Sequence, residues 1–312
     1  MKTTLYSHIS GLRHDTGHSH PERAERLAVI FDLFGENPFS KLTLGNVRPA
    51  KEEQILRAHP LHYIEHIQKS VPDQGHKQID DDTIVSPGSW DAAMHAAGAV
   101  CSAVDDIAAG KTTRAFCAMR PPGHHAEPAT SMGFCLFNNI FIGARHAQAT
   151  HGFNKVAIVD FDVHHGNGTD AMTRRHDGSI LFISSHQDHL WPYTGLEEDN
   201  TESVMNFMLP PKSGSESFRK LYNEKVFPAL THFAPDLLMI SAGFDAHKDD
   251  PLAQMRLVED DFEWVTNELG KIADQSAKGR IVSVLEGGYN LEALKASAAA
   301  HLRALAGPEL TV

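Results

Sequence analysis

The sequence predicts an α/β protein with a central, mostly parallel sheet and helices on both of its faces. Apolar strand-like runs alternate with helix-like stretches along most of the 312 residues, and this alternation is typical of parallel strands joined by crossover helices. No repeat, low-complexity tract or Pro/Ser-rich linker divides the chain. We therefore expect residues 1–312 to form a single domain.

Each expected strand is a short apolar run of the kind found in strands buried on both faces. In chain order the strands are predicted over residues 3–7, 114–119, 155–161, 180–184, 236–241 and 280–285. The stretches between them carry apolar residues at three- and four-residue spacing, which predicts helices over 21–34, 89–109, 138–151, 215–233, 259–278 and 291–306. Ser89 is expected to be an N-cap, and Gly110 and Gly279 lie where helix C-caps belong.

Composition and charge narrow the class of protein. A net charge of −12 argues against a nucleic-acid partner, which would call for a basic face. No apolar run approaches the length of a membrane helix, and the first ten residues lack the apolar core of a secretory signal. The three cysteines, Cys101, Cys117 and Cys135, form no close pair, which is typical of a reducing compartment. We therefore expect a cytoplasmic protein without a membrane partner.

Titratable residues follow four of the expected strands directly. They occupy residues 120–125, 160–169, 242–247 and 286–289. In parallel α/β folds the functional site forms outside the carboxyl ends of the strands. The four segments are therefore expected to meet at one site.

A metal centre is indicated by the segment Asp160–Thr169. Asp160, Asp162 and His164 fall at the two-residue period of a strand and so lie on one side of the chain. A carboxylate and an imidazole at this spacing suit a divalent metal such as Zn²⁺. A catalytic zinc usually has three protein ligands, and Asp245 is the best third candidate, although it could instead cap a helix.

The tandem histidines His124 and His125, which follow Pro-Pro-Gly, favour acid–base catalysis. They could be metal ligands, but adjacent residues rarely turn toward the same ion, and imidazole titrates near neutrality. Each ring needs a partner that fixes its tautomer. Asp160 is the expected partner of one histidine and Asn167 of the other.

Three aromatic residues are candidates for the same site. Tyr289 follows two glycines at a strand end, where its phenol could donate a hydrogen bond to a developing oxyanion. Phe134 and Trp191 would suit the walls of an apolar slot. All three could instead be ordinary core residues.

The chain resembles the zinc-dependent histone deacetylase family, in its class II-like and bacterial amidohydrolase branch, in the motifs RPPGHHA, GFCLFNN, VDFDVHHGNGT, SAGFDAH and LEGGYN. The matches run from about His20 to Asn290. The resemblance implies the arginase–deacetylase fold, with an eight-stranded sheet and one catalytic zinc. It also implies metal-assisted hydrolysis of the amide of acetyl-lysine or a related acyl amine, to acetate and free amine. An acylated peptide or amine is then the expected partner.

The resemblance assigns a role to each matching position. It implies zinc ligation by Asp162, His164 and Asp245, and acid–base catalysis by His124 and His125, of which the second is usually the general base. It implies polarisation of the scissile carbonyl by Tyr289 and, through the backbone carbonyl of Gly133, contact with the substrate amide. It further implies tunnel walls at Phe134 and Trp191, a structural K⁺ site at Asp160 and Ser184, and a product exit path at Arg23.

This chain departs from the family pattern in several places. Asn167 stands where class I members carry Asp, and Trp191 stands where Phe is usual. Residues 71–87 lack the long insertion that acetylpolyamine-specific relatives use to narrow their entrance and dimerise. Asp80, Asp81 and Asp82 could form an acidic rim there or simply a solvated charge run.

Three alternatives to a protein deacetylase follow. An acetylpolyamine amidohydrolase would need the same core residues. A binuclear manganese ureohydrolase would need extra bridging carboxylates, but His165-Gly166 and Ala246-His247 occupy those places. A non-hydrolytic acyl-lysine binding protein would be expected to lack a ligand, a tandem histidine or the tyrosine, and none of these is missing.

Overall fold

The central sheet has eight strands, each parallel to its neighbours, in the computed structural model, which describes residues 2–310. Its order is β2-β1-β5-β10-β9-β6-β7-β8. The strands span β1 (Thr3–Tyr6), β2 (Thr43–Leu44), β5 (Arg114–Cys117), β6 (Val156–Asp160), β7 (Ile180–Gln187), β8 (Val204–Leu209), β9 (Leu237–Ala242) and β10 (Ile281–Leu285). The mostly parallel, eight-stranded α/β fold that we expected is confirmed.

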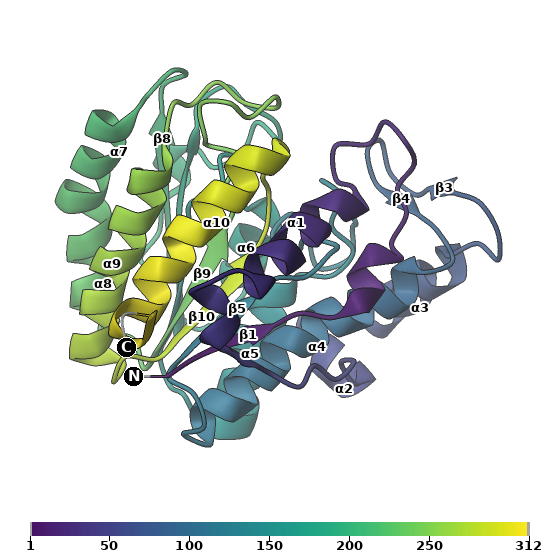
Figure 1. Cartoon of the computed structure of the whole chain (residues 1–312), viewed down its shortest axis with the longest axis horizontal. Coiled ribbons are helices and arrows are strands. Elements are labelled where there is room, and N and C mark those ends of the chain that lie inside the picture. Colours follow the sequence, from purple (N-terminus) through teal and green to yellow (C-terminus); the bar gives the residue numbers. More distant parts are fainter. Residues whose placement is uncertain (1, 311–312) are drawn as a thin grey trace.

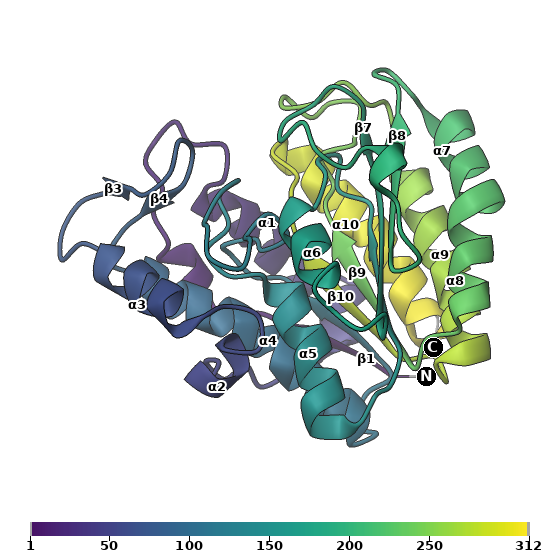
Figure 2. The ribbon, with the colours of Figure 1, turned by 180° about the vertical axis from the view of Figure 1, so that it is seen from behind.

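Helices cover both faces of this sheet (Figures 1 and 2). One face is covered by α1 (Ala24–Gly35), α7 (Ser215–Leu221), α8 (Phe227–Phe233), α9 (Glu259–Ser276) and α10 (Leu291–Ala306), and the other by α4 (Ser89–Ala108), α5 (Asn139–His151) and α6 (Asn167–Thr173). The short helices α2 (Glu52–Ile55) and α3 (Leu61–Ser70) pack outside α4 and α5. A two-stranded antiparallel pair, β3 (Lys77–Gln78) and β4 (Ile84–Val85), lies apart from the main sheet.

Strand residues alternate between two cores because successive side chains in a strand point to opposite faces. In β6, Ala157 and Val159 pack against the α9 and α10 side, whereas Val156 and Ile158 pack against the α4 and α5 side. All four side chains are fully buried. This double burial explains why the strands read as continuous apolar runs in the sequence.

Six of the eight strands were predicted from the sequence, and β2 and β8 were missed. Both lie at the edges of the sheet, where burial is incomplete: both residues of β2 are exposed, and β8 is only partly buried. An edge strand needs less apolar sequence than a central one, so it gives a weaker signal. The helix predicted over 215–233 contains a π-helical turn, Tyr222–Val226, between α7 and α8.

Two helix starts differ from the prediction. The helix expected from residue 21 begins at Ala24, because Arg23 has extended backbone angles (φ −128°, ψ 161°). Ser89 is the first residue of α4 and not its cap, which is Gly88. The Ser89 hydroxyl instead accepts a hydrogen bond from the Ser86 N–H (2.8 Å).

The four strands that precede the titratable segments are consecutive neighbours in the sheet. β5, β10, β9 and β6 lie side by side at its centre, although they are far apart in the sequence. Their carboxyl ends therefore meet at one place, as the sequence predicted. Among the described residues, no helix is long and apolar enough to cross a membrane.

Candidate active site

A cavity of about 210 Å³ opens at the carboxyl ends of the central strands. Its lining contains most of the residues predicted for the substrate site: it consists of Asp82, His125, Gly133, Phe134, His164, Leu190, Trp191, Leu252 and Tyr289. The residues come from separate segments of the chain. The fold thus brings together what the sequence keeps apart.

His164, which lines this cavity, forms a cluster of metal-ligating side chains with Asp162 and Asp245. One ligand atom from each lies within 4.8 Å of the others, and all three residues are buried. The His164 Nδ1 is 3.2 Å from Asp162 Oδ1 and 3.0 Å from Asp245 Oδ2. The structure thus brings the three predicted ligands together.

Backbone amides hold the two carboxylates in place. The Gly287 N–H donates to Asp162 Oδ2 (2.8 Å), and the Val163 N–H donates to Asp245 Oδ1 (3.0 Å). Gly287 must be glycine, because a Cβ there would collide with the carboxylate oxygens of both aspartates. The LEGGYN motif therefore carries Tyr289 and also holds the carboxylate of Asp162 in the cluster of metal-ligating side chains.

The charges of this cluster fit a divalent cation. Burial and the neighbouring Asp162 raise the pKa of Asp245 to about 7. Two buried carboxylates this close repel each other unless a positive charge neutralises them. Two carboxylates and one imidazole form a donor set suited to zinc.

The tandem histidines contact the partners predicted for them. His124 Nδ1 donates to Asp160 Oδ2 (2.9 Å), and His125 Nδ1 donates to Asn167 Oδ1 (2.9 Å). Each of these hydrogen bonds fixes a tautomer and leaves Nε2 as the second functional atom. The two rings lie 3.9 Å apart between centroids.

The two histidines have opposite electrostatic surroundings. Burial alone would lower the pKa of His124, but the carboxylates of Asp162 and Asp160 outweigh burial and raise that pKa to about 10. Burial and the neighbouring imidazoles of His124 and His164 hold the pKa of His125 well below its usual range. His124 therefore favours the protonated form and His125 the neutral form, which divides acid and base roles between them.

Aromatic rings form the walls of the cavity. The Trp191 ring lies edge-on to His125, with centroids 4.8 Å apart, and the Phe134 ring lies edge-on to Tyr289 at 5.9 Å. Gly133 has a φ of +57°, and a Cβ at this position would collide with the His125 ring. Phe134 and Trp191 thus line the cavity and are not ordinary core residues, which was the alternative that the sequence left open.

Glu286 is a functional residue that the sequence analysis left without a role. It is fully buried, and its Oε2 accepts hydrogen bonds from the N–H groups of Gly123 (2.7 Å) and His124 (3.1 Å). It therefore holds the backbone of the tandem histidines. Its place in the LEGGYN motif, directly after an apolar strand, was the available signal. Burial raises its pKa to about 7.

Arg26, and not Arg23, is the arginine that reaches the site. Its guanidinium carbon lies 4.9 Å from the centre of the Tyr289 ring, and its Nε donates to the Gly288 carbonyl (2.6 Å). Glu22 holds Arg26 by an ion pair of 3.0 Å. Arg23 is only partly buried and precedes α1 at its N-cap, where it lines a separate surface hollow. The predicted exit-path role of Arg23 has no contact in its support.

The acidic run at residues 80–82 divides between two environments. Asp82 lines the cavity, and its Oδ1 accepts a hydrogen bond from the Gly133 N–H (3.0 Å). Asp81 is exposed. Asp82 therefore lies where the predicted acidic rim would be, whereas Asp81 is solvated.

Asp160 and Ser184, the predicted K⁺ ligands, are paired across β6 and β7. Asp160 Oδ1 accepts a hydrogen bond from the Asp162 N–H (3.0 Å), and Ser184 Oγ lies 3.0 Å from His186 Nδ1. Both residues are fully buried beside the metal-type cluster. Their role in binding potassium stays a prediction.

The sheet order and this site together define the arginase–deacetylase fold. A solved structure titled "Crystal Structure of HDA15 HD domain" superimposes with a TM-score of 0.92 at 31% identity, over 98% of this chain and 90% of that chain. The profile of the histone deacetylase domain matches residues 20–305. The chain belongs to the histone deacetylase family.

Curated relatives agree with this assignment. The histone deacetylase-like amidohydrolase of Pseudomonas aeruginosa is 40% identical over 281 residues, which are 88% of this chain and 73% of that protein. A probable deacetylase of Archaeoglobus fulgidus is 34% identical over all of this chain and 88% of its own length. Histone deacetylase 14, a chloroplastic protein of Arabidopsis thaliana, is 36% identical over 98% of this chain and 77% of its own length.

Proposed function

We propose that this protein is a zinc-dependent deacetylase that hydrolyses the amide of acetyl-lysine, or of a related acyl amine, to acetate and the free amine. Its family membership supports a deacetylase. The observation that carries the proposal is that three features meet at one cavity: the cluster of metal-ligating side chains, the tandem histidines with their opposite pKa shifts, and the tyrosine. An enzyme of this kind needs all three.

Asp162, His164 and Asp245 would hold the zinc ion. When bound, zinc supplies Lewis acidity to the scissile carbonyl and lowers the pKa of a water molecule toward about 7. The fit rests on three buried donors of the right chemical type, two of which repel each other without a cation. Removal of metal by a chelator should abolish activity, and added Zn²⁺ should restore it.

The chain's own residues divide the remaining work. His125, neutral and oriented by Asn167, takes the proton of the attacking water at Nε2. His124, held in its protonated form by the carboxylates of Asp162 and Asp160, keeps positive charge beside the reacting groups, and one of the tandem pair protonates the leaving amine. The phenolic O–H of Tyr289 donates a hydrogen bond to the developing oxyanion. Trp191 and Phe134 exclude water from the acyl chain.

We further propose a potassium ion beside the zinc site and a cytoplasmic location. Potassium at Asp160 and Ser184 would add positive charge behind the zinc ligands. A cytoplasmic location is proposed from the cysteine pattern.

A binuclear manganese centre is disfavoured because His165, which stands where a bridging carboxylate would be needed, is engaged with Thr194 (2.8 Å) and Asn206 (3.1 Å).

The substrate can be identified by competition. Acetyl-lysine peptides, N-acetylated polyamines and peptides with longer acyl chains should be compared by kcat/KM in one zinc-containing assay. We expect acetate release from acetyl-lysine peptides to be preferred. Preference for acetylpolyamines would support the alternative of an acetylpolyamine amidohydrolase. Binding of the peptides without any acetate release would support a binding protein and contradict the enzymatic proposal.

A further inference from the structure

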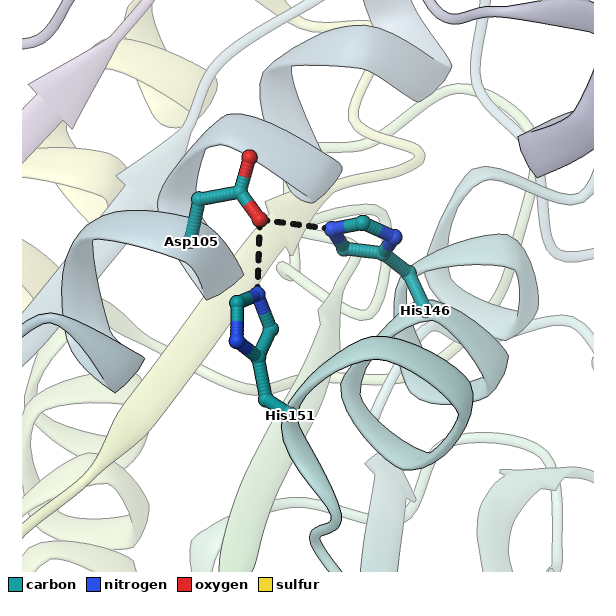
Figure 3. A group of neighbouring side chains, drawn as sticks. All are labelled: Asp105, His146 and His151. Carbon is teal, nitrogen blue, oxygen red and sulfur yellow. Dashed lines mark hydrogen bonds and ion pairs between the residues drawn. The ribbon is translucent and has the colours of Figure 1, made fainter.

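A second cluster of metal-ligating side chains lies on the helices α4 and α5. It consists of Asp105 from α4 and of His146 and His151 from α5 (Figure 3). The start of α5 contacts the loop that carries the tandem histidines, because the Asn139 side chain donates to the Pro121 carbonyl (3.2 Å). His151 is the last residue of the same helix, which is about 20 Å long. The cluster is therefore separate from the catalytic cavity.

Both imidazoles point at the same carboxylate oxygen. The Nε2 atoms of His146 and His151 each lie 2.7 Å from Asp105 Oδ1, and Figure 3 shows the two rings converging on it from different directions. Their centroids are 5.4 Å apart and their planes are nearly perpendicular (86°). His146 is buried, and the His151 side chain is 24% exposed, so solvent reaches one side of the cluster.

We propose that Asp105, His146 and His151 form a second binding site for a divalent transition-metal ion, with Zn²⁺ as the test ion. Two imidazoles and one carboxylate are ligands of the type that zinc takes from proteins. The exposed side leaves a fourth position for water, as in an open zinc site. This inference does not depend on the zinc proposed for the active site.

The dimensions of the cluster suit such an ion. Donors at zinc–ligand distances of 2.0–2.2 Å in a tetrahedral arrangement are about 3.3 Å apart. One ligand atom from each residue already lies within 4.8 Å of the others, and the two nitrogen–oxygen distances are 2.7 Å. An outward shift of about 0.6 Å per contact would admit the ion. His151 lies at a helix end, where such a shift is easily made.

Protons must be redistributed when the ion binds. Each Nε2 now donates to Asp105, so each neutral ring would move its hydrogen to Nδ1 and offer the Nε2 lone pair to the metal. For His146 the new Nδ1–H has an acceptor in Thr150 Oγ1, 3.2 Å away. The competing group is Arg57, whose Nη1 donates to the same Nδ1 (2.5 Å) and must turn away. Arg57 therefore opposes metal binding, both by its charge and by the tautomer that it favours.

Metal content in four versions of the full chain tests the site. The versions are the wild type, His151→Gln, His164→Gln and the double variant, each dialysed against the same buffered Zn²⁺. We expect two, one, one and no bound ions per chain. A single ion in the wild type that is lost in His164→Gln would overturn the second site. Retention of one ion in His164→Gln, and its loss in the double variant, would assign that ion to the second site whether or not the active site binds zinc.

Arg57 and an unrelated histidine provide sharper comparisons. Arg57→Gln should bind the second Zn²⁺ about ten-fold tighter, because it removes the competing donor and charge, whereas His151→Gln should bind it at least about ten-fold more weakly. His76→Gln is the matched control: His76 is also partly exposed and lies 2.9 Å from one carboxylate, that of Asp15, but it belongs to no group of three ligands. Equal affinities in the wild type, His151→Gln and His76→Gln would contradict the proposal.

Discussion

At the scale of single residues, the position of Tyr289 gives it one chemical task. The side chain lines the cavity beside His164, and burial raises the pKa of its phenol well above the usual range. It therefore stays protonated and can donate a hydrogen bond at any physiological pH. A permanently protonated donor at this place suits an oxyanion that forms only in the transition state.

Tyr289→Phe should lower kcat on the order of 10²–10³-fold, as is typical when one oxyanion donor is removed. The ring keeps its packing against Phe134 and Arg26, so the fold should be unaffected. Zinc content should stay at the wild-type level, because Tyr289 is not among the ligand residues. Initial-rate kinetics and metal analysis of the same preparation provide the check. Unchanged turnover would remove the role assigned to Tyr289.

Glu286 is predicted to act through the backbone of the tandem histidines. Glu286→Leu leaves the N–H groups of Gly123 and His124 without their acceptor in a dry environment, at a cost of about 1–3 kcal/mol each. Glu286→Gln keeps one carbonyl acceptor of nearly the same shape and should be much milder. We expect Glu286→Leu to lower kcat more than it changes KM, since the substrate walls are elsewhere.

The comparison between these two variants separates charge from hydrogen bonding. Equal losses in Glu286→Gln and Glu286→Leu would mean that the carboxylate charge, and not its acceptor atom, is what the site requires. A loss confined to thermal stability, with kcat unchanged in both, would make Glu286 a purely structural residue.

At the scale of elements, the sequence predicted the central strands, whose ends carry the candidate site residues, but it did not predict the edge strands or the contact of Arg26 with Tyr289. The strands β5, β6, β9 and β10 are buried on both faces and therefore apolar throughout, which is a strong signal. The edge strands β2 and β8 are partly exposed and gave none. A central strand and the loop after it can thus be predicted together, because the apolar residues of the buried strand are followed directly by titratable residues.

The two arginines near the start of α1 show what a sequence motif cannot supply. Arg23 and Arg26 are only three residues apart, and the start of α1 decides which side chain enters the protein. The predicted start at residue 21 was three residues early. With the helix beginning at Ala24, Arg26 falls on the buried face and reaches Tyr289. Helix ends are the least certain part of a sequence-based reading.

Helix α4 offers a clean test of a predicted helix end. Gly110 follows its C-cap with a φ of +70°, and a Cβ there would meet nothing within 4 Å. Gly110→Ala should therefore destabilise the protein by about 1 kcal/mol through backbone strain alone. The measurement is the shift of the urea unfolding midpoint.

Gly35→Ala is the matched control for that variant. Gly35 is the last residue of α1, and a Cβ there also meets open space, but its φ is not in the left-handed region. The substitution should be neutral or stabilise the protein by up to about 1 kcal/mol, because it reduces the entropy of the unfolded chain. Equal destabilisation in both variants would contradict the strain argument.

At the scale of the whole molecule, burial of neutral histidines should contribute to the loss of stability at acidic pH. Burial lowers the pKa of His14 and His59 to about 4, and that of His301 to about 3. The ordinary value in the unfolded chain is about 6.5. The unfolded state therefore binds more protons than the folded state below pH 6.5. Stability from these residues is complete above pH 6.5 and is lost as the pH falls toward 3–4.

His301→Gln isolates one of these contributions. His301 lies between Thr266 Oγ1 (2.7 Å) and Ser283 Oγ (2.8 Å), and glutamine can replace only part of this contact, so the variant should be less stable at pH 7. Its free energy of unfolding should nevertheless fall less steeply than that of the wild type between pH 6.5 and 5. The difference between the two curves should narrow by about 2 kcal/mol over that interval, from a pKa change of this size.

Urea unfolding at a series of pH values, with His189→Gln as a control, checks the sign and the origin of this effect. The His189 side chain is 85% exposed, so its replacement should leave the slope unchanged. Buried carboxylates are common to the wild type and the variants and therefore cancel in the comparison. The pKa values of Asp245 and Glu286 are raised to about 7, whereas that of Glu22 is lowered to about 2 by the arginines that outweigh its burial. Parallel curves for wild type and His301→Gln above pH 5 would show that His301 has the same pKa in the folded and unfolded states, and that its burial does not govern the acid limit of the fold.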